Sequence, residues 1–205
     1  MKLFLYSTWQ MSARQRTALA ELVGKDLAQV KIAAITNAID VVEDSKEWIG
    51  LSLASLGGEV EEIDLRHWQG NPAGLREKLA GKDVIWLSAG NGFYLRWLLR
   101  ETGADTVIKE LVEQRTIYAG WGGGAVIAGP TLHFFEDPDE LAVVPEVITD
   151  GLNITDTVIV PHMDLGEFAD QMKKIHENLV EAGFKTVPLN EDQALIIDGG
   201  TQRVI

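Results

Sequence analysis

The fold-deciding stretch is Tyr118–Thr131, YAGWGGGAVIAGPT. A β-branched and aromatic run, Thr116–Tyr118, leads into it, and a small apolar run, Ala125–Ala128, leaves it before Gly129-Pro130. Its middle is a glycine cluster: Gly120, Gly122, Gly123 and Gly124. Glycines allow positive φ and close backbone approach. The order therefore predicts a strand, a sharp turn and a helix.

This turn has the spacing of a nucleophile elbow, G-x-S-x-G, in which a serine occupies the apex between strand and helix. Gly120 and Gly124 match the two outer glycines, and Gly122 stands at the apex. Glycine has no side chain to deprotonate, so a covalent mechanism cannot run at that residue. Ser88, in a neighbouring loop, is an alternative nucleophile if it faces the site. Thr131 lies a helix away and is less suitable.

The rest of the chain alternates short apolar runs with helical patterns. Predicted strands are Lys2–Tyr6, Val30–Thr36, Val60–Leu65, Asp83–Leu87, Val158–Val160, Lys185–Pro188, Ala194–Ile197 and Arg203–Ile205. Predicted helices are Ala13–Val23, Val42–Leu56, Pro72–Leu79, Phe93–Glu101, Ala104–Gln114 and Gly166–Ala182. This alternation predicts an α/β fold with a doubly wound, mostly parallel sheet flanked by helices. The 205 residues favour a single domain, residues 1–205.

Loops at the strand ends carry the ligand sites of such sheets. Two of them stand out here, residues 88–92 and the glycine cluster. The N–H groups of Gly90 and Gly123 are candidates for an oxyanion hole, because glycine lets the backbone approach a substrate closely. A turn that binds phosphate is the alternative. No Lys-Ser/Thr pair follows it as in a P-loop, which argues against nucleotide binding.

Acid–base candidates lie further along the chain. His162 follows a predicted strand and a proline, where a catalytic histidine would stand. Asp137, in the acidic segment from His133 to Ile148, is the candidate to orient it. The structural alternatives are a histidine without a catalytic role and a solvated acidic run.

Composition excludes several classes of function. The absence of cysteine rules out disulfides, thiol catalysis and cysteine metal sites. A net charge of −13 opposes binding to nucleic acid or to anionic membranes. No stretch approaches the ~20 apolar residues of a membrane helix.

The N-terminus turns polar too early for a signal peptide, so we expect a cytoplasmic protein. His67, His133 and His176 show no metal-ligand spacing, and we expect neither a metal nor another cofactor.

Together these motifs resemble the peptidase E family of serine peptidases (aspartyl dipeptidase), which is related to cyanophycinase and has a fold similar to class I glutamine amidotransferases. The family elbow reads Y-I-G-W-S-A-G-A and is followed by P-T, similar to Tyr118–Ala125 and Pro130-Thr131. The family loop G-G-G-N is matched at its last two positions by Ser88–Asn91. The family N-P-H segment is matched in part by Val160–His162, and Asp137 falls at the spacing of the family's acidic residue.

The resemblance implies a dipeptidase scaffold for short peptides, with Gly122 at the nucleophile position, His162 as base and Asp137 as its partner. Gly90 and Gly123 would form the oxyanion hole. Two departures affect this expectation. The serine is replaced by glycine, so we expect a very poor serine peptidase unless Gly122 is an engineered replacement. Arginines of the aspartyl-specific members are also absent near the start of the last long helix, where Ala169 and Met172 stand.

Three hypotheses about function follow. The chain is a peptidase scaffold, inactive or weakly active as written, with a short peptide or other small molecule as ligand. Alternatively, it is a non-catalytic homologue that binds a small peptide, an amino acid or a protein partner in the former cleft. The third hypothesis is a different reaction, with His162 as acid or base and the glycine N–H groups stabilising an oxyanion.

Overall fold

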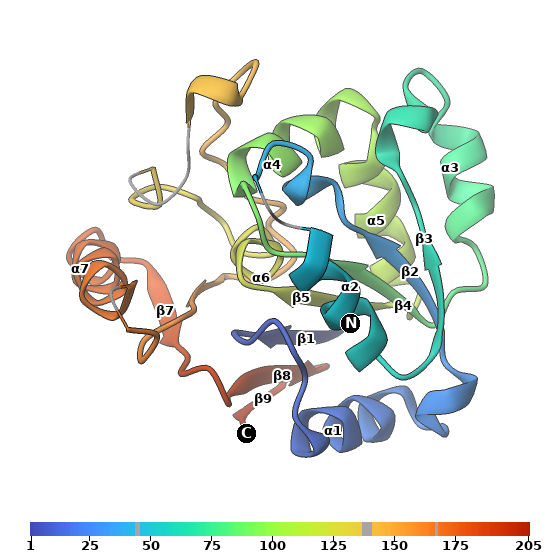
Figure 1. The fold of residues 1–205 in the computed structure, drawn as a ribbon, viewed down its shortest axis with the longest axis horizontal. Helices are drawn as coiled ribbons and strands as arrows, with labels where there is room; N and C mark the ends of the chain where they lie inside the picture. Colours follow the sequence, from blue (N-terminus) through green and yellow to red (C-terminus); the bar gives the residue numbers. More distant parts are fainter. Residues whose placement is uncertain (44–45, 137–140, 167) are drawn as a thin grey trace.

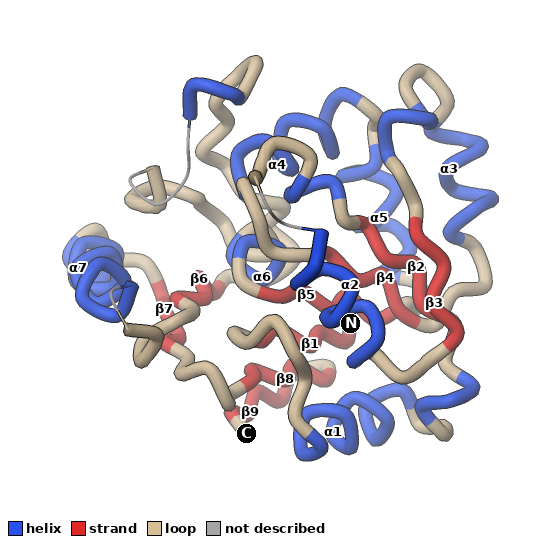
Figure 2. Tube along the Cα trace, viewed as in Figure 1, coloured by secondary structure: helices blue, strands red, loops and turns tan. Residues whose placement is uncertain are grey.

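The computed structural model describes residues 1–43, 46–136, 141–166 and 168–205. Helices surround a central sheet, as the ribbon and tube views show (Figures 1 and 2). The strands are β1 Lys2–Tyr6, β2 Lys31–Ile35, β3 Glu59–Glu62, β4 Val84–Leu87, β5 Ile117–Trp121, β6 Thr157–Val160, β7 Lys185–Pro188, β8 Ala194–Asp198 and β9 Thr201–Val204. The α-helices are α1 Ala13–Val23, α2 Lys46–Ser55, α3 Pro72–Leu79, α4 Gly92–Glu101, α5 Ala104–Glu113, α6 Gly123–Val126 and α7 Phe168–Glu181.

The main sheet has seven strands in the order β3-β2-β4-β5-β1-β8-β9. Strands β3, β2, β4, β5 and β1 pair in parallel, whereas β8 and β9 add an antiparallel edge. The mostly parallel α/β architecture predicted from the sequence is confirmed. The turn predicted at Asp198–Gly200 joins β8 to β9, with Asp198 paired to Thr201.

Two details differ from the prediction. Strands β6 and β7 pair with each other in a separate two-stranded sheet and do not extend the main one. Helix α2 begins at Lys46, later than the predicted start at Val42. The preceding segment forms a 3₁₀ turn at Asn37–Ile39, and the Asn37 side chain donates to Asp40 and Asp64. These bonds stabilise a separate 3₁₀ turn ahead of the helix.

The other long helices follow their sequence signals. Ser12 and Gln15 form a capping box at the start of α1, and Gly24 ends this helix in the left-handed conformation with φ 83°. Pro72 opens α3 at a first-turn position. Within the described part of the chain, no helix combines the length and hydrophobicity that crossing a bilayer requires.

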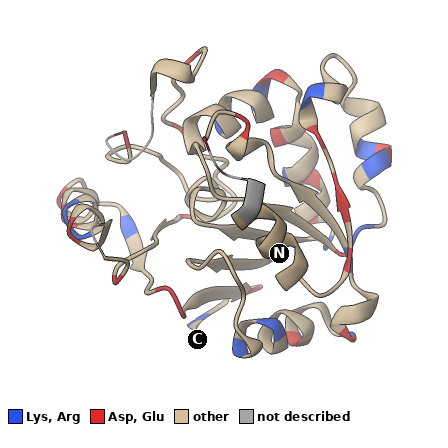
Figure 3. Ribbon diagram, in the orientation of Figure 1, with Lys and Arg blue, Asp and Glu red and all other residues tan. Residues whose placement is uncertain are grey.

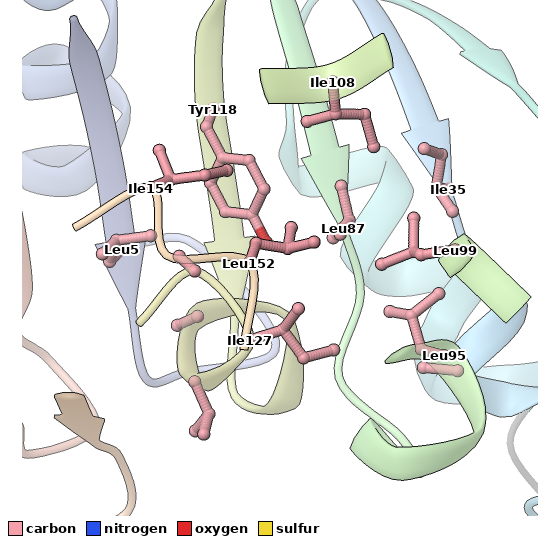
Figure 4. Close-up of a cluster of buried hydrophobic side chains, with 14 of the residues drawn as sticks. Leu5, Ile35, Leu87, Leu95, Leu99, Ile108, Tyr118, Ile127, Leu152 and Ile154 are labelled. Atoms are coloured by element: carbon pink, nitrogen blue, oxygen red, sulfur yellow. The ribbon is translucent and has the colours of Figure 1, made fainter. Parts of the chain in front are cut away.

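Both faces of the main sheet are covered. Helices α1 and α2 pack over Phe4, Tyr6 and Trp86 on one face. Helices α3 to α6 pack over the other face, where Leu5, Leu87 and Tyr118 contribute to a second cluster of buried side chains (Figure 4). Strands buried on both sides read as continuous apolar runs, which is why β1, β4 and β5 were visible in the sequence.

The carboxyl ends of the parallel strands lie at one edge of the main sheet. The loops after β1, β4 and β5 therefore meet there, as a parallel sheet requires. The loop after β6 joins them, since the backbone N–H of His162 donates to Ser7 Oγ at 2.7 Å. This edge is where the residues singled out in the sequence come together.

Candidate active site

The strand–turn–helix predicted from the glycine cluster is present. Strand β5 ends at Trp121, Gly122 has φ 50° and ψ −117°, and α6 starts at Gly123. The Gly122 carbonyl accepts from the N–H groups of Ala125 and Val126 at 2.9 and 3.0 Å. A residue with a side chain would be strained at these dihedral angles, which glycine adopts freely.

The outer glycines of the cluster are required by close approach of the backbone. A Cβ on Gly120 would run into the carbonyl of Gly124, and a Cβ on Gly124 would run into the carbonyl of Leu87. Tyr118 Oη donates to that same Gly124 carbonyl at 2.6 Å. Strand β5 and helix α6 can therefore pack this tightly against β4 only with glycine at both positions.

His162 lies against the turn. Its Nε2 is 3.4 Å from the point where a Cβ on residue 122 would stand. Its own backbone is left-handed, with φ 62°, a conformation uncommon outside glycine. The backbone is held by hydrogen bonds on both sides, because the Met163 N–H donates to Leu189 and the Leu189 N–H donates to Val160. Leu189, directly after β7, thus holds the backbone on both sides of His162.

A carboxylate not singled out in the sequence contacts this histidine. Glu191 Oε1 lies 2.5 Å from His162 Nδ1 and accepts a 2.8 Å hydrogen bond from Ser7 Oγ. With Nδ1–H donating to Glu191, Nε2 is left as an acceptor directed at Gly122. The Glu191 N–H in turn donates to Asp164 at 2.8 Å. An imidazole held through Nδ1 by a carboxylate is the pairing that catalytic triads use to orient a histidine.

The charge state of Glu191 follows from its surroundings. Partial burial alone would raise the pKa of the Glu191 carboxyl. The hydrogen bond and charge of His162, together with the hydrogen bond from Ser7, lower the pKa by more than burial raises it. The net pKa is below the ordinary glutamate value of 4.5. Glu191 is therefore ionised at neutral pH, the form that holds an imidazole in one orientation.

Ala89 occupies the space beside the turn. Its Cβ lies 2.8 Å from the point where a Cβ on residue 122 would stand, closer than Cβ atoms approach one another in proteins. A side chain at position 122 therefore requires Ala89 to move. This contact joins the loop after β4 to the loop after β5.

A cavity of about 690 Å³ opens beside these residues. Its lining includes Gly90, Gly123 and His162, so three of the residues predicted for the site share one cavity. The N–H groups of Gly90 and Gly123 have no hydrogen-bond partner among the described residues. The remaining described lining is mostly apolar: Val41, Val42, Glu43, Ala89, Asn91, Gly92, Val126, Leu132, Phe135, Val143, Pro161, Phe168 and Met172.

Other predicted residues are placed differently. Asp137 lies outside the described residues, so its predicted role stays a prediction. Ser88 does not line the cavity; its side chain is fully buried, and its Oγ has no partner among the described residues. Thr131 is buried as well, where its hydroxyl donates to the Thr149 carbonyl. Neither hydroxyl is positioned to replace the missing nucleophile.

Comparisons with known proteins identify the family of this chain. The family model for peptidase family S51 matches residues 4–205. This chain belongs to peptidase family S51. An uncharacterized peptidase of Listeria monocytogenes is 29% identical over 183 residues, which cover 88% of this chain and 85% of that protein. Peptidase E of Haemophilus influenzae is 30% identical over 114 residues, covering 56% of this chain and 48% of that protein. The resemblance to peptidase E drawn from the motifs is thereby confirmed.

Two solved structures of other proteins have the same fold as this S51 chain. A Listeria monocytogenes protein named after peptidase E superposes with a TM-score of 0.83 at 24% identity, covering all of this chain and 97% of the other. A peptidase from an acI-B1 actinobacterium superposes with a TM-score of 0.71 at 19% identity, covering 100% and 86% of the two chains.

No metal centre accompanies the site among the described residues, since no three His, Asp or Glu side chains gather there as a metal ion would need. The chemistry that this chain's own residues offer is an imidazole with a free Nε2, an ionised partner carboxylate and two backbone donors. Backbone N–H donors and an imidazole are groups suited to binding and polarising a carbonyl, but the apex residue Gly122 has no hydroxyl to act as the nucleophile of a serine peptidase.

Proposed function

We propose that this S51 chain binds a short peptide in the cavity beside His162 and hydrolyses it very poorly. In this proposal the strand–turn–helix is a nucleophile elbow that has lost its serine. Membership of the family supports a peptide ligand, and Gly122 at the apex supports the loss of covalent catalysis.

One observation carries the proposal: the Ala89 methyl group stands against the root of the missing side chain. If Gly122 were only an isolated replacement of a serine, the space for that serine would remain open. Instead, the neighbouring loop has a side chain 2.8 Å from the Cβ position. The motif comparison gives glycine at this loop position in peptidase E. The methyl group of Ala89 therefore fits beside a glycine at position 122 and does not fit beside a residue with a side chain there.

The parts of the site that serve binding are kept. A peptide carbonyl oxygen placed at the Gly90 and Gly123 N–H groups would receive two hydrogen bonds, and His162 would lie beside the same carbon. A cavity of about 690 Å³ falls within the range of small-molecule sites. We assign this cavity to ligand binding and the His162–Glu191 pair to positioning the bound carbonyl.

The test is calorimetric titration of the unmodified chain with a set of dipeptides, while free amino acids are followed by chromatography. We expect saturable binding without detectable turnover. His162→Ala should weaken binding, whereas His133→Ala, a change at a more exposed histidine outside the cavity lining, should not. Turnover by the unmodified chain that disappears in His162→Ala would contradict the proposal.

A second candidate is an acid–base reaction of a bound carbonyl compound. The observation that favours it is the free Nε2 of His162, which faces the turn while Nδ1 is held by Glu191. This candidate predicts turnover whose rate depends on His162 and is indifferent to the residue at position 122. Following the carbonyl compound itself by chromatography distinguishes the two, because the binding proposal predicts no detectable turnover of it.

A further inference from the structure

We infer that the ligand of this cavity carries a large apolar side chain, such as that of leucine, methionine or phenylalanine, and not an acidic one. This inference rests on the proposed function, and it specifies which class of peptide the site would select. Three features of the cavity support it: its apolar wall, its charge and its size.

The apolar wall is built from two parts of the chain. Leu132 and Phe135 come from the segment after α6, and Met172 comes from the second turn of α7. All three are nearly buried, with exposed fractions of 1%, 7% and 3%, and they belong to the main cluster of buried side chains. An apolar ligand side chain placed against them would be removed from water and buried on a surface that the fold already holds in place. This loss of water-exposed apolar area favours binding.

Two more apolar residues, Val143 and Phe168, line the cavity with their side chains partly in solvent. Phe168 opens α7, and its ring lies near the His162 imidazole, with the two ring centroids 6.5 Å apart. A ligand that reaches His162 therefore passes an aromatic surface. Covering Val143 and Phe168 would remove further apolar area from water.

The charges around the cavity oppose an acidic ligand. Among the described lining residues there is no lysine or arginine, whereas Glu43 contributes a carboxylate. Helix α7 carries Lys173 and Lys174, but neither lines the cavity, and Lys173 pairs with Asp170 at 3.1 Å. Further basic segments are coloured on helices such as α1 and α3 and on strand β7 (Figure 3). A ligand carboxylate placed against the apolar wall, away from His162 and the glycine N–H groups, would have no cationic partner there and would carry a large desolvation cost.

The size fits one extended dipeptide or tripeptide with a single bulky side chain. Small-molecule sites have volumes of about 300–1,000 Å³ and are lined mainly by apolar and aromatic groups with few polar ones. With about 690 Å³ and the glycine N–H groups as its polar end, this cavity has that composition. The apolar wall is therefore the part of the site that would determine specificity.

The experiment compares dipeptides of equal length, one with leucine or phenylalanine and one with aspartate at the first position, by calorimetric titration. We expect the apolar peptides to bind about 10- to 100-fold more tightly, the range that side-chain recognition by a pocket typically gives. Phe168→Arg adds a cation to the lining at a half-exposed position and should reduce or reverse this preference.

Val180→Arg is the matched control, since Val180 is a similarly exposed apolar residue on the same helix and lies outside the cavity lining. It should leave the preference unchanged. Equal or tighter binding of the aspartyl peptide by the unmodified chain overturns this inference but leaves the proposed function standing. An unchanged preference in Phe168→Arg also overturns it. Absence of binding by every peptide overturns the proposed function, and this inference with it.

Discussion

The Cβ of Ala89 lies 2.8 Å from the point where a side chain on residue 122 would begin. His162 Nε2 is 3.4 Å from the same point, on a loop held by Ser7 and by the end of β7. The His162 imidazole is thus directed at position 122, where glycine provides no side chain.

Gly122→Ser alone should destabilise the protein. The new residue would adopt φ 50° and ψ −117°, which costs about 1–3 kcal/mol for a residue with a side chain, and its Cβ would press on Ala89. Adding Ala89→Gly should recover part of this loss, because the clash is removed and only the backbone strain remains. Urea unfolding measures the difference in the free energy of unfolding between the single and the double variant. Equal values would show that the Ala89 contact does not contribute to the destabilisation.

The pH dependence of stability should report the Glu191 contacts. Because the pKa of Glu191 is lower in the folded chain than its ordinary value of 4.5, its contribution is complete above that value and is lost as the pH falls through the folded pKa. Glu191→Gln should therefore cost about 1–2 kcal/mol at neutral pH and progressively less in acid. The measurement is the urea midpoint of both proteins across this range.

The neighbouring carboxylate provides the control for that experiment. Asp192→Asn removes an exposed acid one residue away and should leave the pH profile close to that of the unmodified protein. A difference between the unmodified chain and Glu191→Gln that grows toward acid pH would contradict the assignment, because its sign is opposite to that of a lowered carboxyl pKa.

Ser7→Ala should be more destabilising than its small size suggests. Ser7 is fully buried, accepts from the His162 N–H at 2.7 Å and donates to Glu191 at 2.8 Å. Its loss leaves a partly buried N–H without its acceptor, at a cost of about 1–3 kcal/mol. Thr8→Ala removes a hydroxyl whose backbone contact is long, 3.4 Å, and should cost little. Thermal or urea unfolding measures the stability of both variants. Equal stability of Ser7→Ala and Thr8→Ala would contradict this account.

Glycine substitutions should separate structural from tolerant positions. Gly124→Ala should prevent folding or severely destabilise the chain, because its Cβ would collide with the Leu87 and Ser88 carbonyls. Gly50→Ala, in the exposed middle of α2 with open space around it, should stabilise the protein by about 0.5–1 kcal/mol. Soluble yield and melting temperature test both expectations, and a well-folded Gly124→Ala would show that β5 and α6 pack less tightly than described.

Local sequence signals were enough to predict much of this fold. Helix α1 was predicted with the bounds that the structure has, Ala13–Val23, and β4 and β5 were predicted from apolar runs that are buried on both sides. The separate pairing of β6 with β7 could not be predicted, because strand partners depend on long-range packing and not on local pattern. The start of α2 at Lys46 was also not marked by a local sequence signal, and the Asn37 side chain of the preceding 3₁₀ turn donates to the distant Asp64.

The site was predictable where its residues adjoin a motif. Gly90, Gly122, Gly123 and His162 all follow predicted strands, and the structure brings them together. Glu191 was missed because it lies 29 positions after His162 in a polar turn with no motif of its own. The available signal was its place just after β7, at the carboxyl end of a parallel strand, where functional side chains gather. The departure of Ala89 from the glycine of the family loop is visible in the sequence, but its contact with position 122 is tertiary and could not be predicted.

The most direct test of the central claim is the rate of dipeptide hydrolysis by four proteins: the unmodified chain, Gly122→Ser, Ala89→Gly/Gly122→Ser, and the double variant with His162→Ala added. The account predicts no turnover by the unmodified chain, little by Gly122→Ser, and clear turnover by the double variant that His162→Ala abolishes. Equal turnover by the unmodified chain and the double variant would contradict it, because the catalytic group would then lie elsewhere than at residue 122.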